Sequence, residues 1–233
     1  MSTEKRFFSA QNVAVLAVLL ALVIVLQVFG GSIQIGGVSL NFTLLPVVLG
    51  ALVLGPAAGA FLGFVCGLIV LLYGVFGLEA FTAYLWVNSP VMTAIICLVK
   101  TTAAGFVSGW LFRLLSKKNQ IVAVFVASGA APIVNTGLFI VGTLIISGTI
   151  ESYIASVGMT GTSVVYFIII GCAGVNFLIE FAINLLLAPA VSTVYRVVSR
   201  SIGRGTPKGG GKGPSSGKET PEGKASAGKD PSV

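Results

Sequence analysis

The sequence contains no histidine and few charged residues. Lysine, arginine, aspartate and glutamate together make up 9% of the 233 residues, whereas a soluble domain carries roughly a quarter. The absence of histidine removes the commonest metal ligand and a frequent general base. Hydrophobic residues make up 55% of the chain, and this composition is typical of a protein that crosses a membrane several times.

Motifs of ATP-hydrolysing and zinc-dependent enzymes are also missing. The chain has neither a Walker GxxxxGK[ST] sequence nor HExxH. Cys66, Cys97 and Cys172 lie in apolar runs at spacings that match no metal or redox pattern. We therefore expect no catalytic residues, no metal and no cofactor bound by this chain, and no nucleic-acid partner.

Apolar stretches predict six membrane-spanning helices. A span needs roughly 20 apolar residues to cross about 30 Å of hydrocarbon. By that measure the helices lie near residues 10–29, 43–55, 56–77, 89–116, 120–147 and 162–198. The second is short, and the helix-breaking pair Gly55-Pro56 separates it from the third. The predicted fold class is an all-α membrane protein with six transmembrane helices.

Basic residues near the helix ends indicate which side is cytoplasmic. The predicted helix ends carry Lys5, Arg6, Arg113, Lys117, Lys118, Arg196, Arg200 and Arg204. Six spans place all of these on one side, while the loops near 30–42, 78–88 and 148–161 contain no lysine or arginine. We therefore expect both termini to be cytoplasmic.

The composition divides the chain into three parts. Residues 1–9 form a short cytoplasmic N-terminus, and residues 10–198 form the transmembrane domain. Residues 199–233 are rich in glycine, lysine, proline and serine. Such a segment buries too little apolar surface to offset its ordering entropy, so we expect a disordered, basic cytoplasmic tail.

Small residues recur at helical spacing. Gly59, Gly63 and Gly67 form one row, and Gly105 and Gly109 repeat the spacing in a later helix. Such rows allow helices in lipid to approach closely, so we expect the glycines to pack inside the bundle.

Only two charged side chains lie deep in the predicted spans, Lys100 and Glu180. At about 1.5 Å per residue, Lys100 and Asn135 lie roughly 17 and 18 Å from the outer ends of their helices. Asn176 lies roughly 21 Å down the last helix, with Glu180 one turn deeper and Asn184 one turn beyond it. We expect Lys100, Asn135, Asn176 and Glu180 to converge near the middle of the membrane.

Two interpretations of this convergence remain open. A Lys100–Glu180 ion pair with hydrogen-bonded asparagines could stabilise the bundle and do nothing more. Because ionisable groups inside membranes are usually functional, we favour a binding site for a small polar solute. In that site Asn176 is the better candidate for ligand contact, and Glu180 closes the floor by pairing with Lys100 or a neighbouring helix.

The outer loops add candidate contacts. Residues 30–43 alternate apolar and polar side chains between glycines, which predicts a short hairpin or extended cap. We expect Trp86 or Asn88 to touch ligand, because Asn88-Ser89-Pro90 begins the helix that carries Lys100 and a helix N-terminus attracts anions. The candidate binding residues are Asn41, Trp86, Asn88, Lys100, Asn135, Asn176 and Glu180.

Three segments carry a family resemblance. NFTLLPVVLGALVLGPAAGAFLGFVCG (41–67), NSPVMTAIICLVKTTAAG (88–105) and APIVNTG (131–137) resemble the substrate-binding S components of energy-coupling factor (ECF) transporters, as does the chain over about 10–198. The resemblance implies a vitamin-capturing subunit of the cell membrane. Its partners would be a membrane coupling protein and two cytoplasmic ATPases, which use the ATP.

The resemblance also implies roles for particular residues. The AxxxA face of the first helix, Ala17 and Ala21 with Ala14, would pack on the coupling protein. Asn88-x-Pro90 and residues 132–137 most resemble pantothenate-type and related unassigned members. Lys100 would then neutralise the solute carboxylate, while Asn135 and Asn176 would bind its hydroxyls and amide.

Two other classes compete with this interpretation. A stand-alone secondary transporter would use Glu180 as its titrating proton carrier, but the sequence shows no convincing internal repeat of the kind common in such folds. An integral membrane enzyme is disfavoured because the chain has so few polar residues in its spans.

Overall fold

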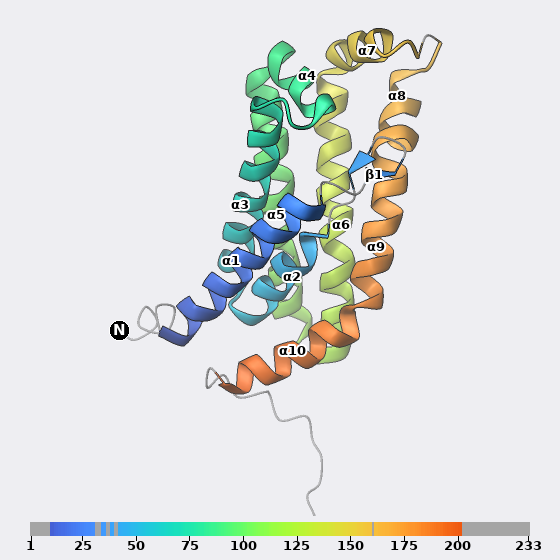
Figure 1. The fold of residues 1–233 in the computed structure, drawn as a ribbon. Coiled ribbons are helices and arrows are strands. Elements are labelled where there is room, and N and C mark those ends of the chain that lie inside the picture. The colour runs from blue at the N-terminus through green and yellow to red at the C-terminus, as the bar shows by residue number, and fades with distance from the viewer. Residues whose placement is uncertain (1–9, 31–33, 36–37, 40–41, 160, 202–233) are drawn as a thin grey trace, which may run out of the picture.

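The computed structural model describes residues 10–30, 34–35, 38–39, 42–159 and 161–201, and this part of the chain is almost entirely helical (Figure 1). The helices are α1 (Ala10–Gly30), α2 (Leu44–Val53), α3 (Pro56–Val75), α4 (Ala80–Asn88), α5 (Pro90–Leu115), α6 (Gln120–Ile145), α7 (Ser147–Ser156), α8 (Val164–Tyr166), the π-helix η2 (Phe167–Gly174), α9 (Val175–Leu186) and α10 (Ala188–Ser201). The strands β1 (Gln34–Ile35) and β2 (Val38–Ser39) form an antiparallel hairpin, as expected.

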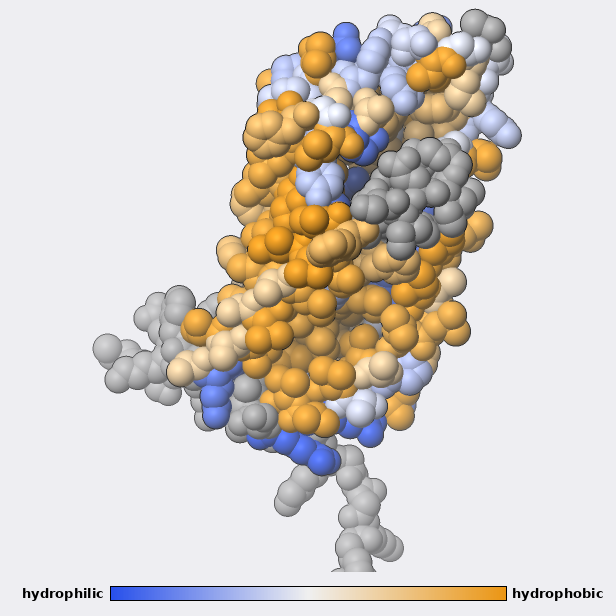
Figure 2. Space-filling view, in the orientation of Figure 1, coloured by the Kyte–Doolittle hydropathy of each residue, from blue (hydrophilic) through white to orange (hydrophobic). Residues whose placement is uncertain are grey.

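Within the described residues, five helical segments are long and apolar enough to cross a membrane: α1, α3, α5, α6 and the continuous stretch from α8 to α9. Helix α2 is a shorter apolar helix. Figure 2 shows hydrophobic surface over the middle of the face in view, with hydrophilic surface gathered toward the two ends of the bundle. The all-α, multi-pass membrane fold is therefore confirmed, while the cytoplasmic location of the termini stays a prediction. Residues 1–9 and 202–233 lie outside the described residues.

Helix α2 lies at the centre of the bundle. Its side chains Leu44, Val47, Val48 and Ala51 are fully buried, and the helix contacts α1, α3, α5 and α6. A tight turn at Gly55, whose φ is +113°, joins it to α3. That backbone conformation favours glycine, and the proline that follows suits the first position of a helix.

The glycine row of α3 packs against α5. A Cβ added at Gly63 would meet the backbone carbonyl of Thr101, and one added at Gly67 would meet that of Cys97. Gly59 and Gly105 face each other in the same way. The predicted internal packing is therefore confirmed, and it sets the position of the helix that carries Lys100.

Two predicted loops are helices in the structure. Residues 78–88 were expected to be irregular, but the Glu79 side chain accepts hydrogen bonds from Phe81 N (2.9 Å) and Thr82 N (2.7 Å) and begins α4. Residues 148–161 were also expected to be a loop, but helix α7 follows α6 after a break at Ile146. Short helices therefore cover the end of the bundle where these two loops were predicted (Figure 1).

The predicted sixth helix, 162–198, is also corrected. It consists of α8, η2 and α9, which end at Leu186, and the separate helix α10. Pro189 lies at the start of α10, and a proline lacks the N–H that an uninterrupted helix would need there.

We predict that Gly63→Ala destabilises the protein by about 1–3 kcal/mol, because the new methyl group would meet backbone atoms that cannot move aside independently. Gly137→Ala in α6 is the matched control, since a Cβ there meets nothing within 4 Å. Thermal unfolding of both variants in detergent measures the difference. Equal stability of the two variants would contradict the packing described here.

Candidate functional site

Three of the predicted site residues meet between α6 and α9. Glu180 is only 2% exposed, and the amide of Asn176, one turn earlier in α9, donates a 2.9 Å hydrogen bond to its Oε1. Asn135 of α6 is 5% exposed and interacts with the same carboxyl group. The polar residues that the sequence spaces i, i+4 along α9 therefore contact the neighbouring helix α6. We call Asn135, Asn176 and Glu180 the acceptor cluster.

The acceptor cluster has unused hydrogen-bonding capacity. Glu180 Oε2, Asn135 Oδ1 and Asn176 Oδ1 are buried and find no hydrogen-bond partner among the described residues. Buried polar atoms are usually paired, because an unpaired one costs about 1–3 kcal/mol. The cluster is therefore suited to a bound molecule that brings hydrogen-bond donors.

Lys100 lies close to this cluster without pairing with it. Its Nζ lies 4.9 Å from the centre of the Phe139 ring, a cation–π contact between α5 and α6. Its charge also acts on Glu180, but Lys100 forms no ion pair with any carboxylate of the described residues. Of the two partners expected for Glu180, Lys100 forms no ion pair with it in the described part of the chain, and the neighbouring helix meets it through Asn135.

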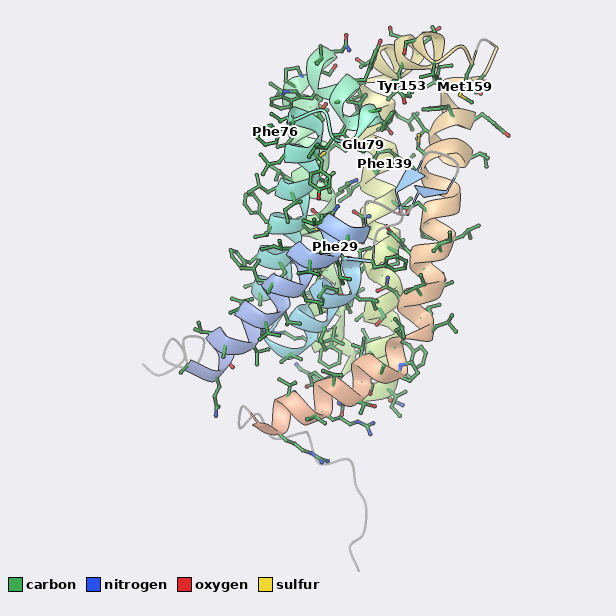
Figure 3. The ribbon with its side chains drawn as sticks, viewed as in Figure 1. Phe29, Phe76, Glu79, Phe139, Tyr153 and Met159 are labelled. Atoms are coloured by element: carbon green, nitrogen blue, oxygen red, sulfur yellow. The ribbon has the colours of Figure 1, made fainter. Side chains whose placement is uncertain are left out.

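An aromatic cluster includes the Phe139 ring that Lys100 contacts. Phe81 and Tyr84 of α4 contact Tyr153 of α7 edge to face, each with ring centres 5.1 Å apart. Phe81 also approaches Phe139 at 6.4 Å and Phe167 of η2 at 6.2 Å. Figure 3 shows Phe139 and Tyr153 together with Glu79 between α4, α6 and α7. The aromatic cluster therefore links α4, α7 and η2 to the ring that Lys100 contacts.

The phenol of Tyr153 is available as a donor. Burial, and then the negative charge of Glu79, raise the pKa of Tyr153 above its usual value. The hydroxyl therefore stays protonated at neutral pH and can donate a hydrogen bond.

A second polar group lies where α1, α3 and the start of α2 meet. Thr43 Oγ1 donates to Gln27 Oε1 at 3.2 Å and lies 3.1 Å from Cys66 Sγ. Lys100 interacts electrostatically with Cys66 as well as with Glu180, so it lies near both polar groups. Gln27 was missed from the sequence, although it is the one polar side chain in the apolar run from 13 to 29.

The candidate residues Trp86 and Asn88 lie on α4 and not in the acceptor cluster. Asn88 is exposed, and its amide donates to the Tyr84 carbonyl of its own helix. Trp86 is half-buried, while Phe81 and Tyr84 from the same helix pack inward. Asn41 lies outside the described residues. Ligand contact by Trp86 and Asn88 stays a prediction.

The surface is hollowed near this site. Figure 2 shows a hollow below α4, at the height of Phe139 in Figure 3, with strongly hydrophilic surface visible inside it. A polar recess in an otherwise apolar belt is the arrangement expected of a small-molecule site in a membrane bundle.

Comparison with known families supports the same interpretation. The family model described as "ECF transporter, substrate-specific component" matches residues 11–192, from the first turn of α1 into α10. No curated protein matches the chain.

We predict that Asn176→Ala lowers the free energy of unfolding by about 1–3 kcal/mol, because it removes the direct hydrogen bond to a buried carboxyl group. Asn88→Ala is the control: this exposed amide bonds only within its own helix, so its loss should stay within about 0.5 kcal/mol. Thermal unfolding in the same detergent compares them. If both variants unfold like the unchanged protein, Asn176 does not support Glu180.

Proposed function

The chain belongs to the substrate-specific components of ECF transporters, and from that premise we propose that it captures a small water-soluble vitamin outside the cell for ATP-driven import. It is a membrane-embedded, substrate-specific subunit and its family is not a family of enzymes. The proposal adds the location in the cell membrane, a coupling protein and two ATPases as partners, and pantothenate as the solute.

The observation that carries the proposal is that charged and polar groups of the site have no partner among the described residues. Lys100 offers a positive charge with no carboxylate partner among the described residues, and the acceptor cluster offers buried oxygens without donors. A matching ligand presents an anion at one end and hydrogen-bond donors at the other. Pantothenate has a carboxylate, an amide N–H and a pair of hydroxyl groups, and so supplies both.

The stabilising-only interpretation fits the structure less well. An ion pair that merely holds the bundle together would join Lys100 to Glu180 directly, with each charge satisfied by the other. Instead, Lys100 rests on the face of Phe139. A cation held by a ring can move to an anionic partner that binds it more strongly, because a cation–π contact is worth about 0.5–1 kcal/mol when exposed and about 2 kcal/mol or more when desolvated.

Helix α1 supports the proposed partnership with a coupling protein. Leu19, Val23 and Gln27 face the bundle at i, i+4 spacing and are buried. Ala14, Ala17 and Ala21 lie on the opposite face of α1 and are exposed. Because small side chains allow a second helix to approach closely, this face suits a membrane-embedded partner.

We predict that Lys100→Gln weakens pantothenate binding about 10- to 100-fold, the range expected for a lost charge-assisted hydrogen bond. Isothermal titration calorimetry on the purified protein measures it. Panthenol, which carries an alcohol in place of the carboxylate, serves as the ligand control and should bind weakly and equally to both proteins. Lys100→Arg keeps the charge and should lose less. Unchanged pantothenate affinity in Lys100→Gln would overturn the assignment of the carboxylate.

We also predict that Ala17→Leu with Ala21→Leu abolishes vitamin uptake while leaving binding unchanged, because the larger side chains would hold the coupling protein away. Uptake into proteoliposomes containing the ECF module and ATP measures this. Ala182→Leu, at another exposed alanine in a span, is the control and should transport normally. Uptake driven by a proton gradient without the module would instead support the stand-alone transporter.

A further inference from the structure

Helix α10 leaves the line of the last span and crosses the end of the bundle, at the bottom of Figure 1. It is anchored there by its own side chains. Ala188 and Val191 are buried in a core shared with α2 and α6, and the Tyr195 ring meets Phe112 of α5 edge to face, with ring centres 4.9 Å apart. One face of α10 is therefore part of the fold.

The rest of α10 presents two different edges. Arg196 and Arg200, one turn apart, are exposed on one edge. Val194 and Val197 are 40% and 62% exposed on the next edge. At about 100° of rotation per residue these edges are adjacent around the helix. A helix with a basic edge beside an apolar edge suits the boundary between lipid headgroups and acyl chains.

The neighbouring turn adds to the positive charge. Arg113 is exposed next to Phe112, the contact of Tyr195, and Lys117 and Lys118 are exposed just after α5 ends. We call this set the basic end of the bundle: Arg113, Lys117, Lys118, Arg196 and Arg200.

No described carboxylate neutralises the basic end. Of the acidic residues in the part of the chain that the structure describes, Glu79 and Glu151 belong to α4 and α7 at the other end of the bundle (Figure 1), and Glu180 is buried. Its occupant is therefore expected to be anionic.

We propose that the basic end is a binding surface for anionic phospholipid headgroups, with Val194 and Val197 at the level of the upper acyl chains. The last apolar span ends at Leu186, directly before α10, so α10 lies where the hydrocarbon region gives way to headgroups. An acidic protein surface could match the arginines, but it would leave the adjacent valines exposed to water. An anionic phospholipid provides a negatively charged headgroup for the arginines and acyl chains for the valines.

The test uses the full-length protein purified in detergent and titrated with phosphatidylglycerol or phosphatidylcholine, with bound lipid counted by native mass spectrometry. The unchanged protein should retain phosphatidylglycerol preferentially. Arg196→Gln with Arg200→Gln should lower that retention by about fivefold per arginine removed. Arg196→Lys with Arg200→Lys keeps the charge and should retain the preference, which separates loss of binding from loss of folding.

Glu151→Gln is the control, since it changes one charge at the other end and should not alter lipid retention. Equal retention of the two lipids by the unchanged protein would overturn the proposal. So would an unchanged preference in the glutamine double variant. Complete displacement of phosphatidylglycerol by inorganic phosphate would also overturn it, by showing a simple anion site that takes no support from the valines.

Discussion

The acceptor cluster between α6 and α9 is organised around the buried carboxyl group of Glu180. Placing Glu180 inside an apolar span costs several kcal/mol unless neighbouring groups offset that cost. Asn176 supplies one hydrogen bond from the preceding turn, and Asn135 approaches from α6. These contacts hold α6 and α9 together, yet they leave Oε2 of the carboxyl group without a partner among the described residues. That unpaired oxygen can accept a hydrogen bond from the ligand that we propose for this site.

Close packing elsewhere determines what faces this carboxyl group. The glycine row of α3 packs closely against the backbone of α5. This packing positions α5 so that Lys100 lies beside Phe139 and near Cys66. Lys100 thus lies close enough to Glu180 for their charges to interact, but it stays separate from it. That separation favours the proposed binding site over a structural ion pair, because both charged groups keep capacity to interact with a third molecule. The π-helix η2 directly precedes Asn176 and Glu180, and π turns occur frequently at functional sites.

Local patterns predicted much of this arrangement. The i, i+4 spacing of Asn176 and Glu180 and the glycine rows are visible in the sequence because they depend only on helical periodicity. The hairpin was predicted from a different local pattern, the alternation of apolar and polar residues between glycines. The Lys100–Phe139 contact could not be predicted, since it depends on the rotation of α5 relative to α6. Helix α4 was missed because its start depends on a single Glu79 cap. The separation of α10 from α9 was missed because the apolar pattern continues through Pro189.

We propose that this chain alone forms a vitamin site from Lys100 and the acceptor cluster. The decisive experiment is a calorimetric titration of the purified, unaltered subunit with a panel of water-soluble vitamins, in the absence of any coupling module. We expect saturable, one-to-one, nanomolar binding of a carboxylate-bearing vitamin, with pantothenate first among them. Failure of every carboxylate-bearing vitamin to bind a correctly folded subunit would contradict it, as would tight binding confined to vitamins that carry no anionic group.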